Sequence, residues 1–167
     1  SYVADNLRKK YGMNPLCLTI RPPMELDIGA RNLSNFISCG FDHIHLTPNV
    51  ETMRLLDRIG FEEYGQGYYG WLIAIFSSVM RTAQNFGINL VFYSEDGEIE
   101  YGGSVAHKNT PVFGADYMEK VYLSDQYKRV MEIANLSDRE RYWFEFPKSA
   151  DTSTIEVAHY SFYEAWD

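Results

Sequence analysis

The sequence is short of basic residues and of cysteine, and each shortage excludes a class of protein. Lysine and arginine number 15 against 23 aspartates and glutamates, so the formal net charge is −8. Nucleic-acid binding depends on cationic side chains that neutralise phosphates, so no nucleic-acid partner is expected. The two cysteines, Cys17 and Cys39, fit neither a disulfide framework nor a close-spaced zinc pattern. We expect both to be buried thiols in a reducing compartment.

Long hydrophobic runs and metal-binding clusters are missing as well. The longest apolar run, WLIAIFSSVM (71–80), is too short to cross a bilayer and predicts a core helix. No secretory signal is visible. His43 and His45 alternate on a predicted strand, while His107 and His159 stand alone. We therefore expect a cytoplasmic protein with no membrane partner and no histidine metal site.

The rest of the composition is that of an ordinary globular domain with many aromatic rings. Of the 167 residues, 46% are hydrophobic and 23% charged, which suits one hydrophobic core. The 13 tyrosines, 10 phenylalanines and 3 tryptophans exceed the usual share of rings. Core packing and stacking on a ligand are therefore competing explanations for each aromatic cluster.

Apolar residues recur at helical spacing in several segments, most of which end at a glycine. The predicted helices cover residues 1–11, 27–39, 50–60, 68–86 and 124–136. Asp27 is expected to cap the second helix, and Gly12, Gly40 and Gly87 to end the first, second and fourth.

Compact apolar runs between these helices predict the strands. They are PLCLTIR (15–21), DHIHL (42–46), NLVFY (89–93), RYWFEF (141–146) and TIEVAHYSFY (154–163). Strands and helices alternate in the first half, which predicts an α/β fold: a mostly parallel sheet with helices on both faces. We divide the chain into an α/β core, residues 1–103, and an elaboration packed on it, residues 104–167. Ligands of such sheets bind at the carboxyl ends of the strands.

An acidic, glycine-rich stretch, SEDGEIEYGGS (94–104), follows the predicted strand NLVFY. Glycines let the backbone approach a ligand closely, and carboxylates can hold Mg²⁺ that bridges nucleotide phosphates. Glu95 and Asp96 are the candidate ligands, with Gly97, Gly102 and Gly103 shaping the loop. The alternative is a solvated surface turn, because Asp-Gly is a common turn dipeptide.

Four segments together resemble N-acetyl sugar amidotransferases, a family of the ATP-pyrophosphatase (PP-loop) superfamily. They are SYVADNLRKKYGMNPLCLTIRP (1–22), ARNLSNFISCGFDHIHLTPN (30–49), GYYGWLIAIFSSVMRTAQNFGINLVFYSEDGEIEYGG (67–103) and HYSFYEAWD (159–167). The resemblance implies the Rossmann-like fold of adenine nucleotide alpha hydrolases, with residues 1–103 as its nucleotide-binding core. The acidic stretch is also similar to the DGxDELFGG signature of asparagine synthetases, with a one-residue shift and Ile99 among the acids.

The resemblance also implies where ATP binds. In the superfamily an SGGKDS-type loop holds the phosphates; here SYVADNL resembles the residues that follow that loop, with Ser1 as its last remnant. Main-chain groups of Leu18, Thr19 and Ile20 would line the adenine pocket. We expect the chain to be truncated at both ends, to lack the central strand and the phosphate loop, and to turn over little ATP by itself.

Further site residues follow from the same resemblance. Asn32 matches a position that faces the nucleotide; its alternative is an exposed helical asparagine. Arg21 and Arg31 could meet phosphate or an acidic sugar, or be solvated. Tyr68 and Tyr69 are the candidate sugar-binding residues. Packing in a core or interface is the alternative for both, as it is for the neighbouring Trp71.

The implied reaction converts an acetamido group into an acetamidino group. ATP activates the amide oxygen as an AMP ester with loss of pyrophosphate, and ammonia then displaces AMP; Glu95 and Asp96 would serve this chemistry, with Asp96 on Mg²⁺. The resemblance implies an N-acetylated bacterial surface sugar, as in lipopolysaccharide O-antigen or in the pseudaminic acid of flagellin. Ammonia would come from a glutaminase partner with a cyclase-like, ammonia-channelling subunit.

Three other functions stay open. The chain could be a nucleotide-binding regulatory module without a sugar pocket, or a scaffold domain whose aromatic-rich second half packs on a partner. A tRNA-modifying PP-loop enzyme is the third, and it should carry a basic face, which the net charge of −8 argues against.

Overall fold

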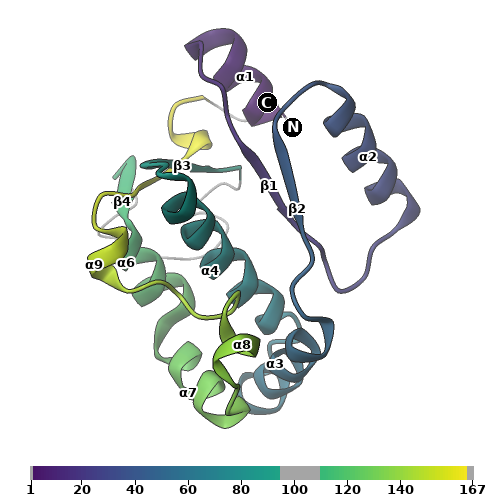
Figure 1. Cartoon of the computed structure of the whole chain (residues 1–167), viewed down its shortest axis with the longest axis vertical. Helices are drawn as coiled ribbons and strands as arrows, with labels where there is room; N and C mark the ends of the chain where they lie inside the picture. Colours follow the sequence, from purple (N-terminus) through teal and green to yellow (C-terminus); the bar gives the residue numbers. More distant parts are fainter. Residues whose placement is uncertain (1, 95–109, 165–167) are drawn as a thin grey trace.

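Helices make up most of the structure, a computed structural model that describes residues 2–94 and 110–164 (Figure 1). The longer helices are α1 (Tyr2–Tyr11), α2 (Asp27–Ser38), α3 (Val50–Tyr64), α4 (Tyr69–Phe86) and α7 (Ser124–Ala134). The short ones are α6 (Ala115–Tyr117), α8 (Asp138–Arg141), α9 (Ser149–Thr152), the π-helix η2 (Met118–Leu123) and the 3₁₀-helix η3 (Tyr160–Phe162). The strands are β1 (Cys17–Ile20), β2 (His43–Leu46), β3 (Leu90–Tyr93), β4 (Val112–Gly114) and β5 (Glu156–His159).

The helix ends follow from local sequence. Asn49 caps α3, because its Oδ1 accepts from the N–H groups of Glu51 at 3.0 Å and Thr52 at 3.1 Å. Gly65 and Gly87 end α3 and α4 in the left-handed conformation that glycine adopts without strain. The predicted Asp27 cap is wrong: Leu26 is the cap residue of α2, and no side chain bonds to the first turn.

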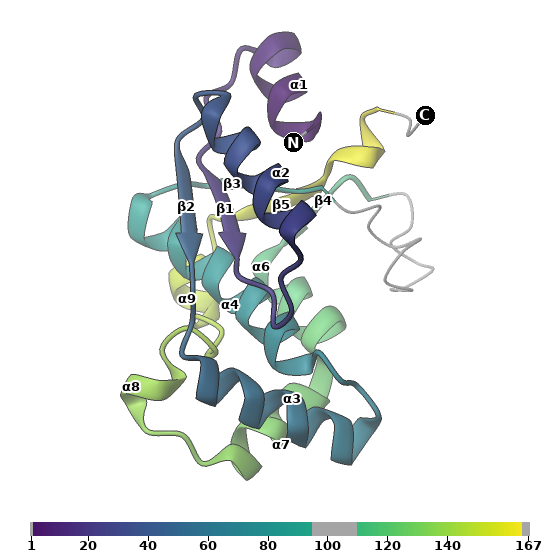
Figure 2. The same ribbon diagram turned by 90° about the vertical axis from the view of Figure 1, so that its right-hand side faces the viewer.

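The strands form two sheets rather than one. β1 pairs with β2 in parallel, with Cys17 opposite His43. The second sheet has the order β3-β5-β4, with β3 and β5 parallel and β4 and β5 antiparallel. Figure 2 shows β1 and β2 running along the long axis of the molecule, whereas β3 and β5 run across it. The α/β class and the parallel pairing are therefore found, but no continuous sheet joins the described strands.

Helices cover both faces of both strand pairs. Ile20 of β1 is buried in the main core with α4, while the ring of His43 on β2 meets Phe36 of α2 at 5.3 Å between centroids. In the second sheet, Tyr93 packs on Phe76 of α4 at 5.7 Å, and its neighbour Phe92 points to the other face, against α1. α4 thus lies on one face of each sheet, and α1 and α2 lie on the opposite faces.

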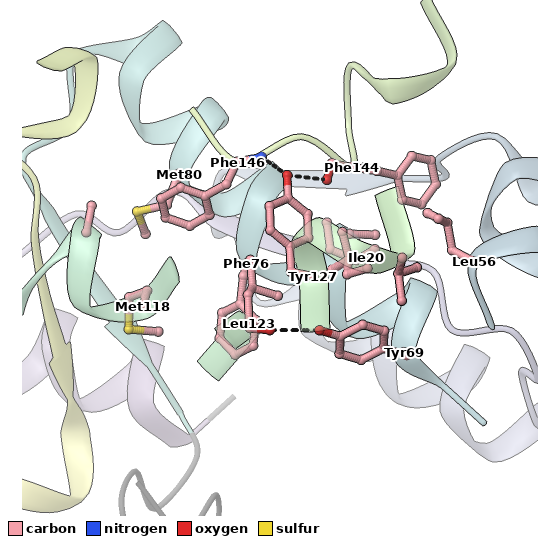
Figure 3. Packing of buried hydrophobic residues seen from close by; sticks show 14 of the residues in the cluster. Ile20, Leu56, Tyr69, Phe76, Met80, Met118, Leu123, Tyr127, Phe144 and Phe146 are labelled. Carbon is pink, nitrogen blue, oxygen red and sulfur yellow. Dashed lines mark hydrogen bonds between the residues drawn. The ribbon is translucent and has the colours of Figure 1, made fainter. Parts of the chain in front are cut away.

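The main core surrounds α4 and draws on both halves of the sequence (Figure 3). Side chains of α3 and α4 pack there with side chains of η2, α7 and the segment 144–146. Two glycines let α3 and α4 approach: a Cβ on Gly70 would lie 2.5 Å from the carbonyl oxygen of Met53, and one on Gly60 would lie 2.5 Å from Cβ of Tyr69. The second half therefore shares the core of the first.

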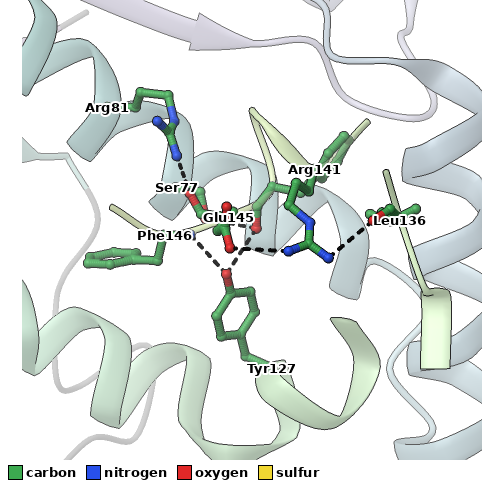
Figure 4. A network of polar contacts seen from close by, with 8 residues as sticks. Ser77, Arg81, Tyr127, Leu136, Arg141, Glu145 and Phe146 are labelled. Carbon is green, nitrogen blue, oxygen red and sulfur yellow. Dashed lines mark hydrogen bonds and ion pairs between the residues drawn. The ribbon is translucent and has the colours of Figure 1, made fainter. Parts of the chain in front are cut away.

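Two further sequence expectations are wrong. RYWFEF (141–146) forms turns after α8 instead of a strand, and Figure 4 shows why. Its main-chain carbonyls accept hydrogen bonds from side chains of α4 and α7. The Phe144 carbonyl, for example, accepts from Ser77 Oγ at 3.2 Å, so it is satisfied without pairing to another strand. Cys39 is exposed and Cys17 only half-buried, because α2 buries none of its residues.

Candidate functional site

The carboxyl ends of β1 and β3 are the places where the sequence predicts a ligand. On β1, the N–H of Cys17 donates to the Asp42 carbonyl at 2.8 Å and the N–H of Arg21 donates to the Leu46 carbonyl at 2.9 Å. Since main-chain groups of successive residues in a strand point to alternate sides, the odd-numbered residues of β1 face β2. The even-numbered residues face an edge that no described strand pairs with.

This alternation divides the three predicted adenine-pocket positions. Thr19 turns its main-chain groups toward β2, so they are used within the sheet. Leu18 and Ile20 turn theirs toward the open edge. The Ile20 carbonyl accepts a hydrogen bond from the indole Nε1–H of Trp71 at 3.4 Å, and a carbonyl has a second lone pair for another donor. Leu18 and Ile20 are therefore the positions at which main-chain groups could meet an adenine ring.

Trp71 reaches Ile20 because the start of α4 is held in place. The half-buried carboxylate of Asp57 on α3 accepts from the N–H of Trp71 at 3.3 Å, which satisfies one of the unpaired donors at the helix start. Burial raises the pKa of Asp57, while the N–H groups of Trp71 and Gly70 act in the opposite direction. The protein's own carboxylate thus occupies this helix N-terminus, and a phosphate would have to bind elsewhere.

The carboxyl end of β3 lies along the same helix. Tyr93, the last residue of β3, contacts Phe76 of α4, and Ile20, the last residue of β1, contacts Trp71. Trp71 and Phe76 are separated by about 7.5 Å along the helix axis at 1.5 Å per residue. The two strand ends therefore both contact the first half of α4, on sides of the helix about 140° apart, and they belong to different sheets.

A cluster of rings surrounds the carboxyl end of β5, beside that of β3. His159, the last residue of β5, is 5% exposed, and its Nε2 lies 3.3 Å from the hydroxyl of Tyr122 on η2. Its ring also meets Tyr93 at 6.0 Å and Phe113 at 6.1 Å. π-helical turns are rare and recur at functional sites, and this one brings Tyr122 onto His159.

This ring cluster was not predicted from the sequence. His159 stands alone in the sequence, and the residues around it come from β3, β4 and η2, which no spacing rule connects. The one available signal is its place at the end of the predicted strand TIEVAHYSFY, because the carboxyl ends of parallel strands gather polar side chains. A strand end at His159 indicates a polar side chain at the edge of the sheet, but it does not identify the rings around it.

The predicted arginines and Asn32 are at the surface. Arg21, at the end of β1, pairs its Nε with Glu25 Oε2 at 3.5 Å. Arg31 and Asn32 lie on α2 and are exposed. The structure therefore places Arg21 at the open carboxyl end of β1, whereas the two α2 residues are solvated.

The two candidate sugar-binding tyrosines have different environments. Tyr69 is 2% exposed, and its hydroxyl donates to the Leu123 carbonyl at 2.7 Å. Burial raises the pKa of this phenol, and the packing alternative is favoured for it. Tyr68 is 53% exposed and stays a candidate for stacking on a sugar. Trp71 is half-buried and bonded to β1, so it also packs.

The predicted metal and loop residues lie outside the described residues. They are Ser1, Glu95, Asp96, Gly97, Gly102 and Gly103. Among the described residues, 2–94 and 110–164, no group of three or more His, Cys, Asp or Glu side chains could hold a metal ion. Nor does any helix in these ranges combine the length and apolarity that a bilayer requires. The Mg²⁺ assignment to Asp96 therefore stays a prediction.

Neither family models nor curated proteins give a match to this chain. The open edge of β1 presents main-chain donors and acceptors of a kind that can pair with the edge of a planar heterocycle.

Proposed function

We propose that this chain is part of an ATP-dependent N-acetyl sugar amidotransferase. ATP would bind with its adenine edge on the main chain of Leu18 and Ile20. Its phosphates would extend along the first half of α4 toward the acidic stretch after β3, where Asp96 would hold Mg²⁺ and Glu95 would assist. The main observation that supports this proposal is that the last residues of β1 and β3 contact α4 at Trp71 and Phe76, which are less than two helical turns apart.

The proposed reaction replaces oxygen by nitrogen at an acetamido carbon. The amide oxygen attacks the α-phosphorus of ATP, the bond to pyrophosphate breaks, and an adenylylated imidate forms. Ammonia then adds to the carbon and AMP leaves with the original amide oxygen, which gives the amidine. Positioning and charge neutralisation by Mg²⁺ would supply most of the catalysis, and the ammonia would come from a glutaminase partner with a cyclase-like subunit.

The sheet arrangement adds a condition to this proposal. β1 and β3 each have an edge that no described strand covers, and Leu90 on β3 is 40% exposed. In the proposed fold a central strand would pair with both edges and align the two sheets. We therefore expect the 167 residues alone to bind nucleotide weakly and to release little pyrophosphate.

Calorimetry with ATP tests the nucleotide site. We expect ATP to bind, binding to strengthen when Mg²⁺ is added, and Asp96→Asn to weaken it about tenfold, which is about 1.4 kcal/mol. Glu62→Gln is the matched control, because Glu62 is an exposed acid on α3 away from both strand ends. Absence of heat at millimolar ATP, or equal weakening by both variants, would contradict the proposal.

A nucleotide-binding module without sugar chemistry is the second candidate. The observation that favours it is the burial of Tyr69, which removes one of the two tyrosines expected to contact a sugar. Titration with an N-acetylated nucleotide sugar in the presence of AMP separates the candidates. The amidotransferase predicts a second binding event that Tyr68→Ala weakens, whereas the module predicts none.

A further inference from the structure

Helix α2 is attached to the rest of the protein by a small contact. None of its residues is buried. Its Phe36 ring lies 5.3 Å from the ring of Phe41 and 5.3 Å from the imidazole of His43, measured between centroids. Because little apolar surface is removed from water there, the stability of docking is expected to be small.

Arg8 of α1 completes this contact. Its Nη2 donates to the Gly40 carbonyl at 2.9 Å and its Nη1 to the Cys39 carbonyl at 3.4 Å, at the carboxyl end of α2. The guanidinium carbon also lies 3.6 Å from the centroid of the Phe41 ring. We call Arg8, Phe36, Phe41 and His43 the α2 contact.

His43 is the one titratable member of the α2 contact near neutral pH. Its Nε2 lies 2.9 Å from Thr19 Oγ1, while its buried Nδ1 meets no hydrogen-bond partner among the described residues. A neutral imidazole can leave Nδ1 as an unprotonated acceptor at modest cost. A protonated imidazole must donate from both nitrogens, and a buried N–H without an acceptor is destabilising.

The charges around His43 also oppose protonation. The guanidinium of Arg8 lies over the ring of Phe41, and Arg8 is not among the causes that set the pKa of His43. His45 follows two residues later on β2, and burial, followed by His45, lowers the pKa of His43. Cys17 stands opposite on β1 with its thiol pKa raised by burial, so it supplies no anion.

The nearest residues of α2 and the sheet offer no carboxylate to compensate. The turn of α2 before Phe36 presents Asn32 and Leu33 on the same side, both uncharged. Asp42 precedes His43 on the chain and uses its carbonyl to accept from Cys17; it is not among the causes that set the pKa of His43.

We propose that His43 is a pH switch that docks α2 on the β1–β2 sheet when neutral and releases it when protonated. Releasing α2 lets both imidazole nitrogens reach water, where each N–H of the protonated ring finds an acceptor. The inference does not depend on the proposed function. If that function holds, acidification would also move Arg31 and Asn32 relative to β1.

Hydrogen exchange measured by mass spectrometry tests the switch. Exchange of peptides from α2 (27–38) and from α3 (50–64) is compared between about pH 7.5 and pH 5, on either side of the usual histidine pKa of about 6.5. After correction for the intrinsic rate, we expect exchange of α2 to rise by up to about thirtyfold at the lower pH, since an undocked imidazole with the usual pKa of about 6.5 is protonated about 30 times more often than it is neutral at pH 5. Exchange of α3 should not change.

Two variants identify the group responsible. His43→Gln is neutral at both pH values and can still bond to Thr19, so its α2 exchange should be independent of pH. His45→Gln is the comparison: His45 is exposed on the same strand, and because it is one of the groups that lower the pKa of His43, this variant should still respond to pH, with a smaller amplitude than the wild type. A wild type without a response, or His43→Gln with an unchanged one, would overturn the proposal.

A measurement on the wild type decides the matter if His43→Gln does not fold. The imidazole C–H signals of His43 are titrated by NMR alongside the amide signals of α2. The proposal predicts one common midpoint. Amide changes in α2 with a midpoint that differs from that of His43 would refute it.

Discussion

At the scale of single residues, Tyr127 shows how one hydroxyl fixes an irregular segment. It is 6% exposed, accepts from the N–H of Phe146 at 2.8 Å and donates to the Phe144 carbonyl at 3.3 Å. Arg81 reaches the next carbonyl, that of Glu145, at 2.9 Å (Figure 4). Segment 144–146 therefore has its main-chain groups satisfied without belonging to a sheet.

Tyr127→Phe should destabilise the protein by about 1–3 kcal/mol, because it leaves the buried N–H of Phe146 without its acceptor and removes one of the two donors to the Phe144 carbonyl, the other being Ser77. Urea unfolding measures the loss. Tyr68→Phe is the control, since Tyr68 is 53% exposed and its hydroxyl is expected to contribute within about 0.5 kcal/mol. Equal effects of the two variants would contradict the role given to Tyr127.

Alkaline pH should reduce the difference between wild type and Tyr127→Phe. Burial raises the pKa of Tyr127 from 10.0 to about 12. The folded protein thus holds this proton more tightly than the unfolded chain, so the contribution of Tyr127 is complete below pH 10.0 and is lost as pH rises toward 12. Unfolding of both proteins between pH 9 and 11, about one unit on either side of the usual tyrosine pKa of about 10, tests this. A constant difference would be evidence against it.

Single residues were also the hardest to predict from sequence. The pairing of Tyr122 with His159 joins positions 37 residues apart through a π-helix, and no helical or strand period connects them. Tyr69 was expected at a ligand, yet its ring fills the space beside Gly60 and its hydroxyl bonds to Leu123. Chain neighbours do not determine which of two adjacent tyrosines points inward; the packing of α3 on α4 does.

At the scale of elements, the closeness of α3 and α4 depends on glycine. A Cβ at Gly70 would lie 2.5 Å from the Met53 carbonyl oxygen and 2.8 Å from Cβ of Leu56. The backbone of α3 would have to move, and with it Asp57, which holds the start of α4. The position of Trp71 against β1 therefore depends on this helix contact.

Gly70→Ala should cost about 1–3 kcal/mol through overpacking. Gly29→Ala is the matched control within a helix: a Cβ there meets nothing within 4 Å, so the change should stabilise by about 0.5–1 kcal/mol. Thermal unfolding followed by circular dichroism measures both. A Gly70→Ala variant as stable as the wild type would show that α3 and α4 are not this close.

The elements that sequence predicted well are those with their own period and caps. α4 and α7 have apolar stripes and clear ends, such as Gly87 after α4, so local information was sufficient. The start of α3 was predicted as well, but the helix continues past the predicted end to Tyr64, before Gly65. The strand assignment of RYWFEF failed because an aromatic-rich run predicts burial without identifying the partner of its backbone. TIEVAHYSFY was too long for a similar reason: β5 ends at His159, where η3 begins.

At the scale of the whole molecule, two sheets share one helix. Alternation of strands and helices predicted the α/β class and the parallel pairs, because parallel neighbours require a crossover between them. It did not predict that β1–β2 and β3–β5 would lie in separate sheets. The alternation indicates that neighbouring strands are parallel, but it does not specify which strands pair with each other. α4 connects the two pairs, because the last residues of β1 and β3 both contact its first half.

The most direct test of this account is an NMR titration of the chain with ATP and Mg²⁺. The account predicts that the indole N–H of Trp71 and the amides of Leu18 and Ile20 shift together, while amides of α7 keep their positions. Replacing Mg²⁺ by paramagnetic Mn²⁺ should broaden the signals of Ser94 and Trp71 before those of α7. Shifts confined to other surfaces, or no shift at millimolar ATP, would contradict a nucleotide site at the ends of β1 and β3.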